Sequence, residues 1–195
     1  MEQSGQLLMR RFVEIPKGVT LNLEVNSKIT VKGKLGTLER SFPYISTRLE
    51  LVTTNDEGRT GNFLAIFDYY PKRRQKSLIG TIEGLVKNMI TGVQFGYLYK
   101  MKIVYTHFPI TLTPAKDGVV LAGHYGEKGK SFVPILPGVK VTIKGDDVLL
   151  EGIDIEAVSQ SAARIQDRTK LKGKHARDPR VFMDGIYVYE SGIKR

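Results

Sequence analysis

The sequence predicts an α+β protein built from two tandem duplicated domains, each an antiparallel β-sheet structure packed with one α-helix. Three observations lead to this prediction. The stretches 15–33 and 136–152 share one pattern, each is followed by a stretch of helical periodicity, and 195 residues suffice for two small domains. We expect the domains to join near Gly96, so that the first repeat domain spans residues 1–96 and the second spans 97–195.

Both matched stretches are predicted β-hairpins. Each opens on an apolar residue and a proline, with a glycine close behind, and then alternates apolar and polar residues, which is typical of a strand with one buried face. The alternating apolar residues are Val19, Leu21, Leu23 and Val25 in the first stretch, and Val139, Val141 and Ile143 in the second. A polar turn follows in each, and a second strand returns to Gly33 or to Gly152. The spacings from Val19 to Val139 and from Gly33 to Gly152 differ by one residue, which favours internal duplication over chance similarity.

One helix is predicted after each hairpin. Apolar residues recur at helical spacing at Ile79, Ile82, Val86, Met89, Ile90 and Val93 in the first domain, and at Ile155, Val158, Ala162 and Ile165 in the second. We expect Ser77 to cap the first helix and Asp154 to cap the second. Further strands are predicted at 47–52, 62–70, 98–105, 110–112 and 119–122.

Composition narrows the class of partner. Thirty Lys and Arg against twenty Asp and Glu give a net charge of +10, which favours nucleic acid first and an anionic membrane surface second. The absence of cysteine excludes disulfides and thiolate metal sites. No apolar run approaches the roughly 20 residues that span a bilayer, and the start of the chain does not resemble a signal peptide. We therefore expect a cytoplasmic or nuclear protein with no membrane partner.

Basic residues gather outside the alternating strands, in stretches that carry glycine and proline and that we expect to be loops. They are Lys72, Arg73 and Arg74 in one tract; Arg168, Lys170, Lys172, Lys174, Arg177 and Arg180 in a second; and Lys128 and Lys130 in a smaller group. A charged run is usually a solvated surface, but flexible cations in loops also suit an irregular phosphate backbone. Among the aromatic residues, Tyr125 is the best candidate for stacking on an unpaired base.

The stretch GHYGEKGKS at 123–131 resembles a phosphate-binding loop of a nucleotide-binding protein. That loop requires a glycine at position 124, where this chain has His124, and a helix starting at Lys130. Pro134 and Pro137 oppose such a helix, and we expect the next regular element to be the strand at Val139. The stretch is therefore interpreted as a hairpin between two strands.

Other catalytic patterns are also missing from the sequence. His107, His124 and His175 lie far apart without metal-ligand spacing, and the glycines at 92 and 96 lack the dinucleotide-binding pattern. We expect no enzyme and no cofactor. A nucleotide-binding protein, and a stand-alone module that binds nucleic acid or a protein partner, remain as alternatives.

Several stretches together resemble one family. They are Ile-Pro-Lys-Gly-Val at 15–19, Lys-Asn-Met-Ile-Thr-Gly-Val at 87–93, Tyr-Lys-Met-Lys-Ile-Val-Tyr-Thr-His-Phe-Pro-Ile at 99–110, Pro-Gly-Val at 137–139, Leu-Glu-Gly-Ile-Asp-Ile-Glu-Ala-Val-Ser-Gln-Ser-Ala-Ala at 150–163, and Phe-Met-Asp-Gly-Ile-Tyr-Val at 182–188. They are similar to the large-subunit ribosomal protein six family (universal uL6 type, numbered nine in eukaryotic cytosolic ribosomes). The stretches at 99–110 and 184–187 resemble its eukaryotic and archaeal branch.

The resemblance implies a duplicated fold and a structural constituent of the large ribosomal subunit. It implies binding to large-subunit ribosomal RNA near the elongation-factor site and the sarcin-ricin loop, a role in translation, and neighbouring ribosomal proteins as partners rather than a homo-oligomer. It places the protein in cytoplasmic ribosomes, with nucleolar assembly in a eukaryote. The second domain is then the main RNA-binding candidate, through the tract 164–180, which includes Arg164 and His175, and through the hairpin at 126–128.

The chain departs from the family pattern at a few positions. It has Lys-Gly-Lys-Leu-Gly at 32–36 where Lys-Gly-Pro-Arg-Gly is frequent, so Lys34 is the available substitute for an arginine contact. Ile153 replaces a frequent asparagine, and Thr106 replaces a frequent alanine. The segment 55–79 matches poorly and is interpreted as a lineage-specific variation.

Overall fold

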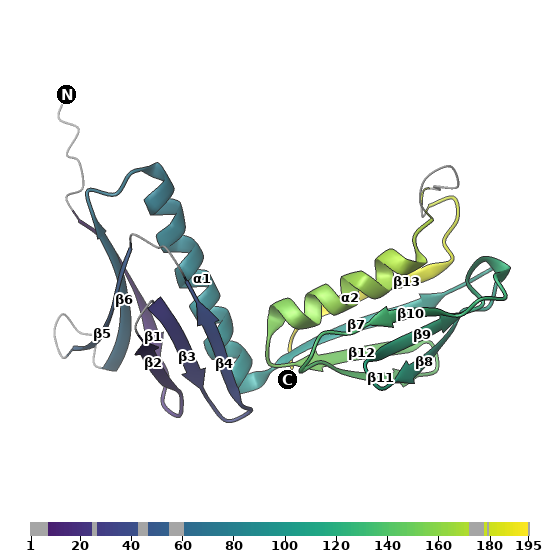
Figure 1. Cartoon of the computed structure of the whole chain (residues 1–195), viewed down its shortest axis with the longest axis horizontal. Helices are drawn as coiled ribbons and strands as arrows, with labels where there is room; N and C mark the ends of the chain where they lie inside the picture. Colours follow the sequence, from purple (N-terminus) through teal and green to yellow (C-terminus); the bar gives the residue numbers. More distant parts are fainter. Residues whose placement is uncertain are drawn as a thin grey trace. The chain divides into compact units, whose positions relative to one another are not determined.

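The computed structural model describes residues 8–24, 27–42, 47–54, 61–171, 178 and 180–194. The chain divides into two compact units, Met1–Gln94 and Phe95–Arg195. In the described residues each unit has antiparallel sheets packed with one α-helix (Figure 1). The predicted α+β class with two tandem domains is thereby confirmed.

The described part of the first unit forms two antiparallel sheets and helix α1 (Arg73–Phe95). One sheet has the order β1–β6–β5, from β1 (Leu8–Ile15), β6 (Gly61–Tyr69) and β5 (Arg48–Thr54). The other has the order β2–β3–β4, from β2 (Thr20–Glu24), β3 (Lys28–Lys32) and β4 (Thr37–Ser41). The predicted stripe on α1 is buried against residues of both sheets, among them Val13, Ile29, Val31, Leu64 and Ile66. One helix therefore closes the core of this unit.

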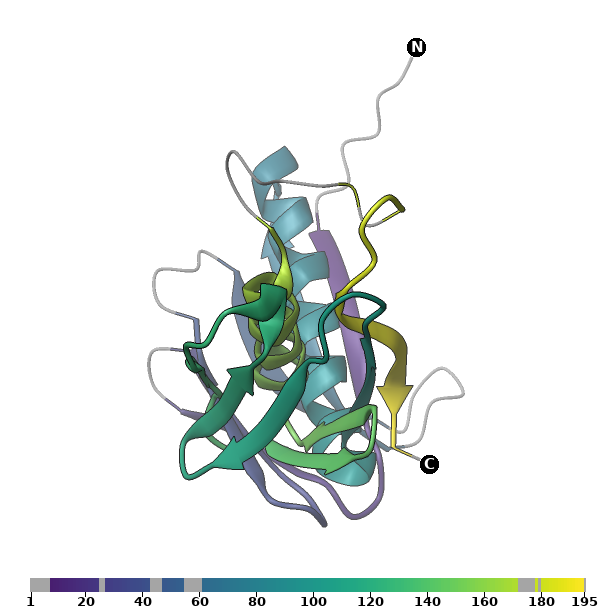
Figure 2. The same ribbon diagram turned by 90° about the vertical axis from the view of Figure 1, so that its right-hand side faces the viewer.

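The second unit repeats this arrangement with helix α2 (Ile155–Thr169). One sheet has the order β10–β9–β8, from β10 (Ser131–Pro134), β9 (Gly118–Ala122) and β8 (Thr111–Ala115). The other has the order β11–β12–β7–β13, from β11 (Lys140–Lys144), β12 (Asp147–Gly152), β7 (Tyr97–Val104) and β13 (Gly185–Ile193). Figures 1 and 2 show α2 lying along these strands, and it contacts β7, β10, β12 and β13.

The two helices begin by different means. Asp154 caps α2 as predicted, since its carboxylate accepts a 3.0 Å hydrogen bond from the N–H of Glu156. Helix α1 begins at Arg73, before the predicted cap, and the side-chain oxygen of Gln75 accepts a 2.7 Å hydrogen bond from the N–H of Lys72. The prediction that Ser77 caps the helix is wrong, because its hydroxyl lies inside α1 and donates to the carbonyl of Arg74.

The earlier start of α1 also corrects the predicted loop at 71–76, because Arg73 and Arg74 lie in the first helical turn. The strands predicted from the sequence likewise omitted β1, β4 and β13, and the hairpin predicted at 123–131 gave no bounds for its second strand, which is β10. The Arg10–Arg11 pair interrupts the alternation of β1, while β10 has four residues and ends at Pro134. Proline is tolerated there because β10 is at the edge of its sheet, so a regular element does precede Val139.

The two matched glycines lie where the end of a strand approaches a helix closely. A Cβ atom on Gly33 would lie 2.6 Å from Cγ2 of Val93 in α1, and one on Gly152 would lie 2.7 Å from Cγ2 of Val158 in α2. Both distances are shorter than packed carbon atoms tolerate. The matched glycines of the two hairpins therefore serve the same purpose, which is to let a helix pack directly on the sheet.

We expect Gly33→Ala and Gly152→Ala to lower the free energy of unfolding by about 1–3 kcal/mol each, because the added methyl group overpacks a buried contact. Gly84→Ala in α1 is the matched control. Its Cβ would meet nothing within 4 Å, and the substitution should stabilise the helix by up to about 1 kcal/mol. Urea unfolding checks all three variants, and equal shifts for Gly33→Ala and Gly84→Ala would contradict the close-packing explanation.

Candidate nucleic-acid interface

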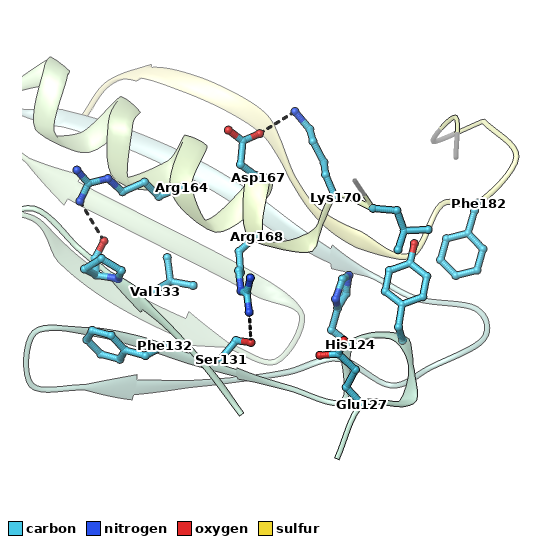
Figure 3. Close-up of a pocket in the computed structure, with 13 residues that line it drawn as sticks. His124, Glu127, Ser131, Phe132, Val133, Arg164, Asp167, Arg168, Lys170 and Phe182 are labelled. Atoms are coloured by element: carbon cyan, nitrogen blue, oxygen red, sulfur yellow. Dashed lines mark hydrogen bonds and ion pairs between the residues drawn. The ribbon is translucent and has the colours of Figure 1, made fainter. Parts of the chain in front are cut away.

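A groove of about 900 Å³ lies in the second unit, bordered by α2, β10 and the turn after β9 (Figure 3). Its lining combines cations and aromatic rings, and includes Arg164, Arg168, Lys170, His124, Tyr125, Phe132 and Phe182. Four residues singled out from the sequence meet here: Tyr125, Arg164, Arg168 and Lys170. The groove is therefore the place where the predicted basic tract and the predicted hairpin come together.

Two arginines one helical turn apart project from α2 over strand β10. Arg164 Nη1 donates to the carbonyl oxygen of Pro134 at 3.4 Å, and Arg168 Nη2 donates to Oγ of Ser131 at 2.7 Å (Figure 3). A guanidinium carries five N–H donors in a planar fork that matches phosphate oxygens. Each of these hydrogen bonds uses one donor, so both side chains are oriented by the protein and keep donors for a ligand.

The groove also contains acidic groups. Lys170 Nζ lies 3.0 Å from Oδ1 of Asp167, and Glu127 lines the turn side. The Lys170–Asp167 pair is exposed, with 47% and 57% of the two side chains accessible, so solvent screens it strongly. The three cations outnumber the two carboxylates, and the lining keeps a positive balance.

The turn after β9 contains the stretch GHYGEKGKS. Strands β9 and β10 pair antiparallel on either side of it, with Leu121 opposite Ser131, as the hairpin interpretation predicted. Gly123 and Gly126 adopt left-handed backbone angles, with φ of 78° and 68°, which only glycine adopts at low cost. A Cβ on Gly123 would also collide with the carbonyl oxygen of Pro109. Strand β10, rather than a helix, follows Lys130, so the geometry of a nucleotide-binding loop is absent from this stretch.

Thr169, the last residue of α2, holds three segments together. Its hydroxyl donates to the carbonyl of Gln166 at 2.9 Å and accepts from the N–H of Ile186 in β13 at 3.1 Å. Its carbonyl oxygen lies 2.7 Å from Nε2 of His124. Because a carbonyl oxygen can only accept, Nε2 of His124 carries the proton in this hydrogen bond. The buried Thr169 thus fixes the turn after β9 against the end of α2.

Three aromatic rings from distant segments stack beside the groove. The ring centroids of Tyr125 and Phe182 are 5.0 Å apart with an interplanar angle of 16°, and those of Phe182 and His107 are 4.9 Å apart at 15°. These are offset-stacked arrangements. His124 packs edge-on against Tyr125 at 4.4 Å. Phe182 therefore covers one face of Tyr125. A base cannot stack on that face of the predicted base-stacking residue.

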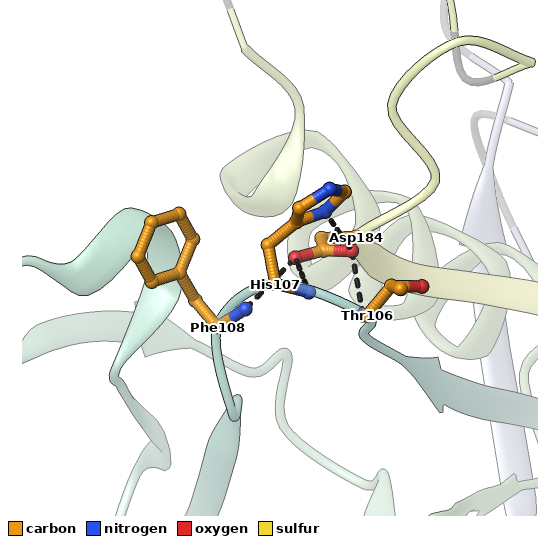
Figure 4. Close-up of polar contacts among 4 residues, drawn as sticks. All are labelled: Thr106, His107, Phe108 and Asp184. Carbon is orange, nitrogen blue, oxygen red and sulfur yellow. Dashed lines mark hydrogen bonds and ion pairs between the residues drawn. The ribbon is translucent and has the colours of Figure 1, made fainter.

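The buried carboxylate of Asp184 fixes the segment that carries His107 (Figure 4). It accepts hydrogen bonds from three successive backbone N–H groups, those of Thr106 (2.8 Å), His107 (3.0 Å) and Phe108 (3.1 Å). Nδ1 of His107 lies 3.4 Å from the same carboxylate. Burial alone would raise the pKa of Asp184, but the hydrogen bonds from Thr106, Phe108 and His107 outweigh it and hold the pKa below its ordinary value of 3.8.

The other predicted site residues that the structure describes lie outside this lining. Lys128 and Lys130 are exposed in the turn. Arg180 is exposed and pairs with Asp178 at 2.7 Å. Lys72, Arg73 and Arg74 are exposed at the start of α1 in the first unit. Lys172, Lys174, His175 and Arg177 fall outside the described residues.

The sequence patterns did not place Phe182, Phe132, His107 or Asp184 in a site. The Asp-Gly-Ile-Tyr stretch at 184–187 resembles the family pattern, and the one further signal for Asp184 is an acidic residue directly before a glycine and a strand. No local pattern links residues 107, 125 and 182, because they lie on three separate segments.

Two other classes of site find no support in the described residues. Within them, no cluster of three or more His, Cys, Asp or Glu side chains could hold a metal ion. In the same part of the chain, no helix is both long and apolar enough to cross a membrane.

The fold and the groove together define a class of protein: a basic α+β protein of two tandem units, one of which carries a groove lined by cations and aromatic rings. The family model of ribosomal protein L6 matches the chain twice, at residues 15–96 and 108–184. The chain belongs to the ribosomal protein L6 family.

Individual relatives support the same family assignment. Large ribosomal subunit protein uL6 of Aeropyrum pernix is 44% identical, over 93% of this chain and 93% of the relative. The proteins of the same description from Ignicoccus hospitalis and Methanobrevibacter smithii are 42% and 39% identical, over 91% and 92% of this chain and 91% and 94% of their own lengths. The similarity thus extends over nearly the whole chain.

We expect Asp184→Asn to destabilise the second unit by about 1–3 kcal/mol near neutral pH, because an amide cannot replace both carboxylate oxygens as acceptors. A lowered folded-state pKa stabilises the protein fully above the ordinary value of 3.8, and this stabilisation disappears as the pH falls through the lower, folded-state value. The stability difference between the two proteins should therefore shrink below pH 3.8. Urea unfolding from about pH 7 down to about pH 2 measures it, and a difference that stays constant over this range would refute the role given to the charge.

Proposed function

We propose that this chain is a structural constituent of the large ribosomal subunit, and that the groove of the second unit binds the phosphate backbone of large-subunit ribosomal RNA. The observation that carries the proposal is the orientation of Arg164 and Arg168 over β10, beside aromatic rings, in a chain with a net charge of +10. Family membership and the names of the relatives support it.

The groove suits an RNA backbone better than a small anion. Its volume of about 900 Å³ is large, and its cations are spread along a helix rather than converging on one point. Arginine forks bind phosphate oxygens, and adjacent aromatic rings provide surfaces for bases that are not paired. Such a combination is typical of RNA contacts outside regular duplexes.

The finer parts of the proposal rest on the family resemblance. They are a location near the elongation-factor site and the sarcin-ricin loop, a contribution to translation, neighbouring ribosomal proteins as partners, and residence in cytoplasmic ribosomes, with nucleolar assembly in a eukaryote. The second domain predicted from the sequence, residues 97–195, is proposed as the main RNA-binding domain. Its hairpin cations Lys128 and Lys130, and the tract that continues through Lys172, Lys174, His175, Arg177 and Arg180, would extend the RNA-binding surface beyond the groove.

The first unit offers a second, smaller set of cations. Lys72, Arg73 and Arg74 lie at the start of α1, whose first turn has no acidic residue. Cations are disfavoured at a helix N-terminus, because the backbone N–H groups already leave positive charge there. An RNA phosphate would relieve this repulsion, so we include these three residues in the proposed RNA-binding surface.

We expect the double variant Arg164→Ala/Arg168→Ala to bind a cognate large-subunit RNA fragment more weakly. The slope of log K against log salt should fall by roughly 0.7–0.9 for each phosphate that the variant no longer neutralises. Lys140→Ala/Lys144→Ala removes the same charge from exposed positions on β11 outside the groove lining. Filter binding at several salt concentrations measures both variants, and equal reductions in affinity for the two pairs would show that only net charge matters.

We expect the full chain to sediment with large ribosomal subunits at moderate salt, and to bind neither ATP nor GTP at millimolar concentration. The stretch at 123–131 lacks the helix that a nucleotide-binding loop needs, which is the physical reason for the second expectation. Sucrose-gradient sedimentation and equilibrium dialysis with labelled nucleotide provide the measurements. If the chain bound nucleotide saturably and did not sediment with ribosomal subunits, a nucleotide-binding protein would be supported and the ribosomal function would be contradicted.

A further inference from the structure

The stacked rings of His107, Phe182 and Tyr125 form a column with two unequal ends. Successive centroids are 4.9 and 5.0 Å apart, so the two end rings lie no more than about 10 Å from each other. Tyr125 and Phe182 line the groove, whereas His107 lies beyond it, on the segment after β7. The column therefore leads from the phosphate-binding groove to a neighbouring surface.

The His107 end of the column is the accessible one. Phe182 covers one face of the imidazole, and Asp184 faces its Nδ1 edge at 3.4 Å, yet 54% of the side chain remains exposed. The exposed area lies away from the face that Phe182 covers and from the edge that Asp184 faces, and we infer that the face opposite Phe182 contributes to it. At the other end, Tyr125 is half-buried and has His124 packed against it.

The His107 ring is also held in place before any ligand arrives. The N–H groups of residues 106–108 all donate to the buried Asp184 carboxylate, so the backbone that carries His107 has little freedom (Figure 4). Stacking on Phe182 then fixes the plane of the ring. A ligand that stacks on a preorganised ring loses less of its binding energy to ordering the protein.

We propose that an unpaired nucleobase of the bound RNA stacks on the exposed face of His107 and becomes the fourth ring of the column. The proposal rests on the proposed RNA-binding function and makes it more specific. Every base has a flat π-face that can stack on an aromatic side chain, but only an unpaired base can reach one. The site would therefore favour RNA with a bulged or looped nucleotide over a continuous duplex, and Tyr125 would support the column instead of contacting the base on its covered face.

Two RNA hairpins test this inference with the full chain. They have the same sequence except that one of them carries one additional, bulged 2-aminopurine, whose fluorescence is quenched on stacking. We expect the wild-type chain to prefer the bulged hairpin and to quench its fluorescence. His107→Ala should weaken binding of the bulged hairpin by about tenfold and leave binding of the paired hairpin unchanged, since the variant offers no ring on which the base can stack.

Two further variants separate stacking from other effects. His107→Phe keeps a flat ring and should retain both the preference and the quenching. Tyr105→Ala removes an aromatic ring that is 47% exposed two residues away, and should leave the preference unchanged. Thermal unfolding of each variant shows whether the second unit stays folded.

Each outcome bears on one proposal. If the wild-type chain binds neither hairpin nor a cognate ribosomal RNA fragment, the proposed RNA-binding function fails. If it binds RNA but His107→Ala keeps the preference for the bulge, or His107→Phe loses it, base stacking on His107 is wrong and RNA binding by the groove stands. Capture of a protein partner that depends on His107, without any preference for the bulge, would also overturn the inference.

Discussion

Both units depend on one packing constraint: a single helix must cover the apolar faces of strands from two separate sheets. In the second unit Val158, Ala162 and Ile165 are buried by this packing. Because a helix turns once in about 3.6 residues, burying that stripe directs Arg164 and Arg168 over β10 and toward solvent. Core packing thus determines the direction in which the two arginines of the groove project. Gly152 contributes because its lack of a Cβ atom lets α2 lie close to the sheet.

A second constraint is electrostatic and joins two segments that are far apart in the sequence. The carboxylate of Asp184 ties the segment after β7 to the start of β13 through three backbone N–H donors. Phe182 lies two residues before Asp184, so the same hydrogen bonds bring its ring between His107 and Tyr125. A buried carboxylate is costly unless its oxygens are satisfied, and here that need orders the aromatic side of the groove.

The site was predictable only where its residues follow a local pattern. Arg164 and Arg168 are one turn apart on a helix that the apolar stripe predicts, so their common face follows from the sequence. The role of Phe182 does not, since nothing near it in the chain indicates a partner. Lys128 and Lys130 are a different case: their charge is evident from the sequence, the turn places them outside the groove lining, and their RNA contact stays a prediction. Ser77 does not cap α1, because the helix begins at Arg73 and the side chain of Gln75 accepts the hydrogen bond from the N–H of Lys72.

The α+β class, the two matched hairpins, the buried helix stripes and the strong positive charge all follow from the amino-acid sequence alone. The structural features among them depend on residues within a few positions of one another, where periodicity and turn chemistry act. The stacking of His107, Phe182 and Tyr125, and the hold of Asp184 on residues 106–108, emerge only in the folded chain. These interactions join segments far apart in the chain, and their geometry is set by how α2 and the strands pack, which local patterns do not encode.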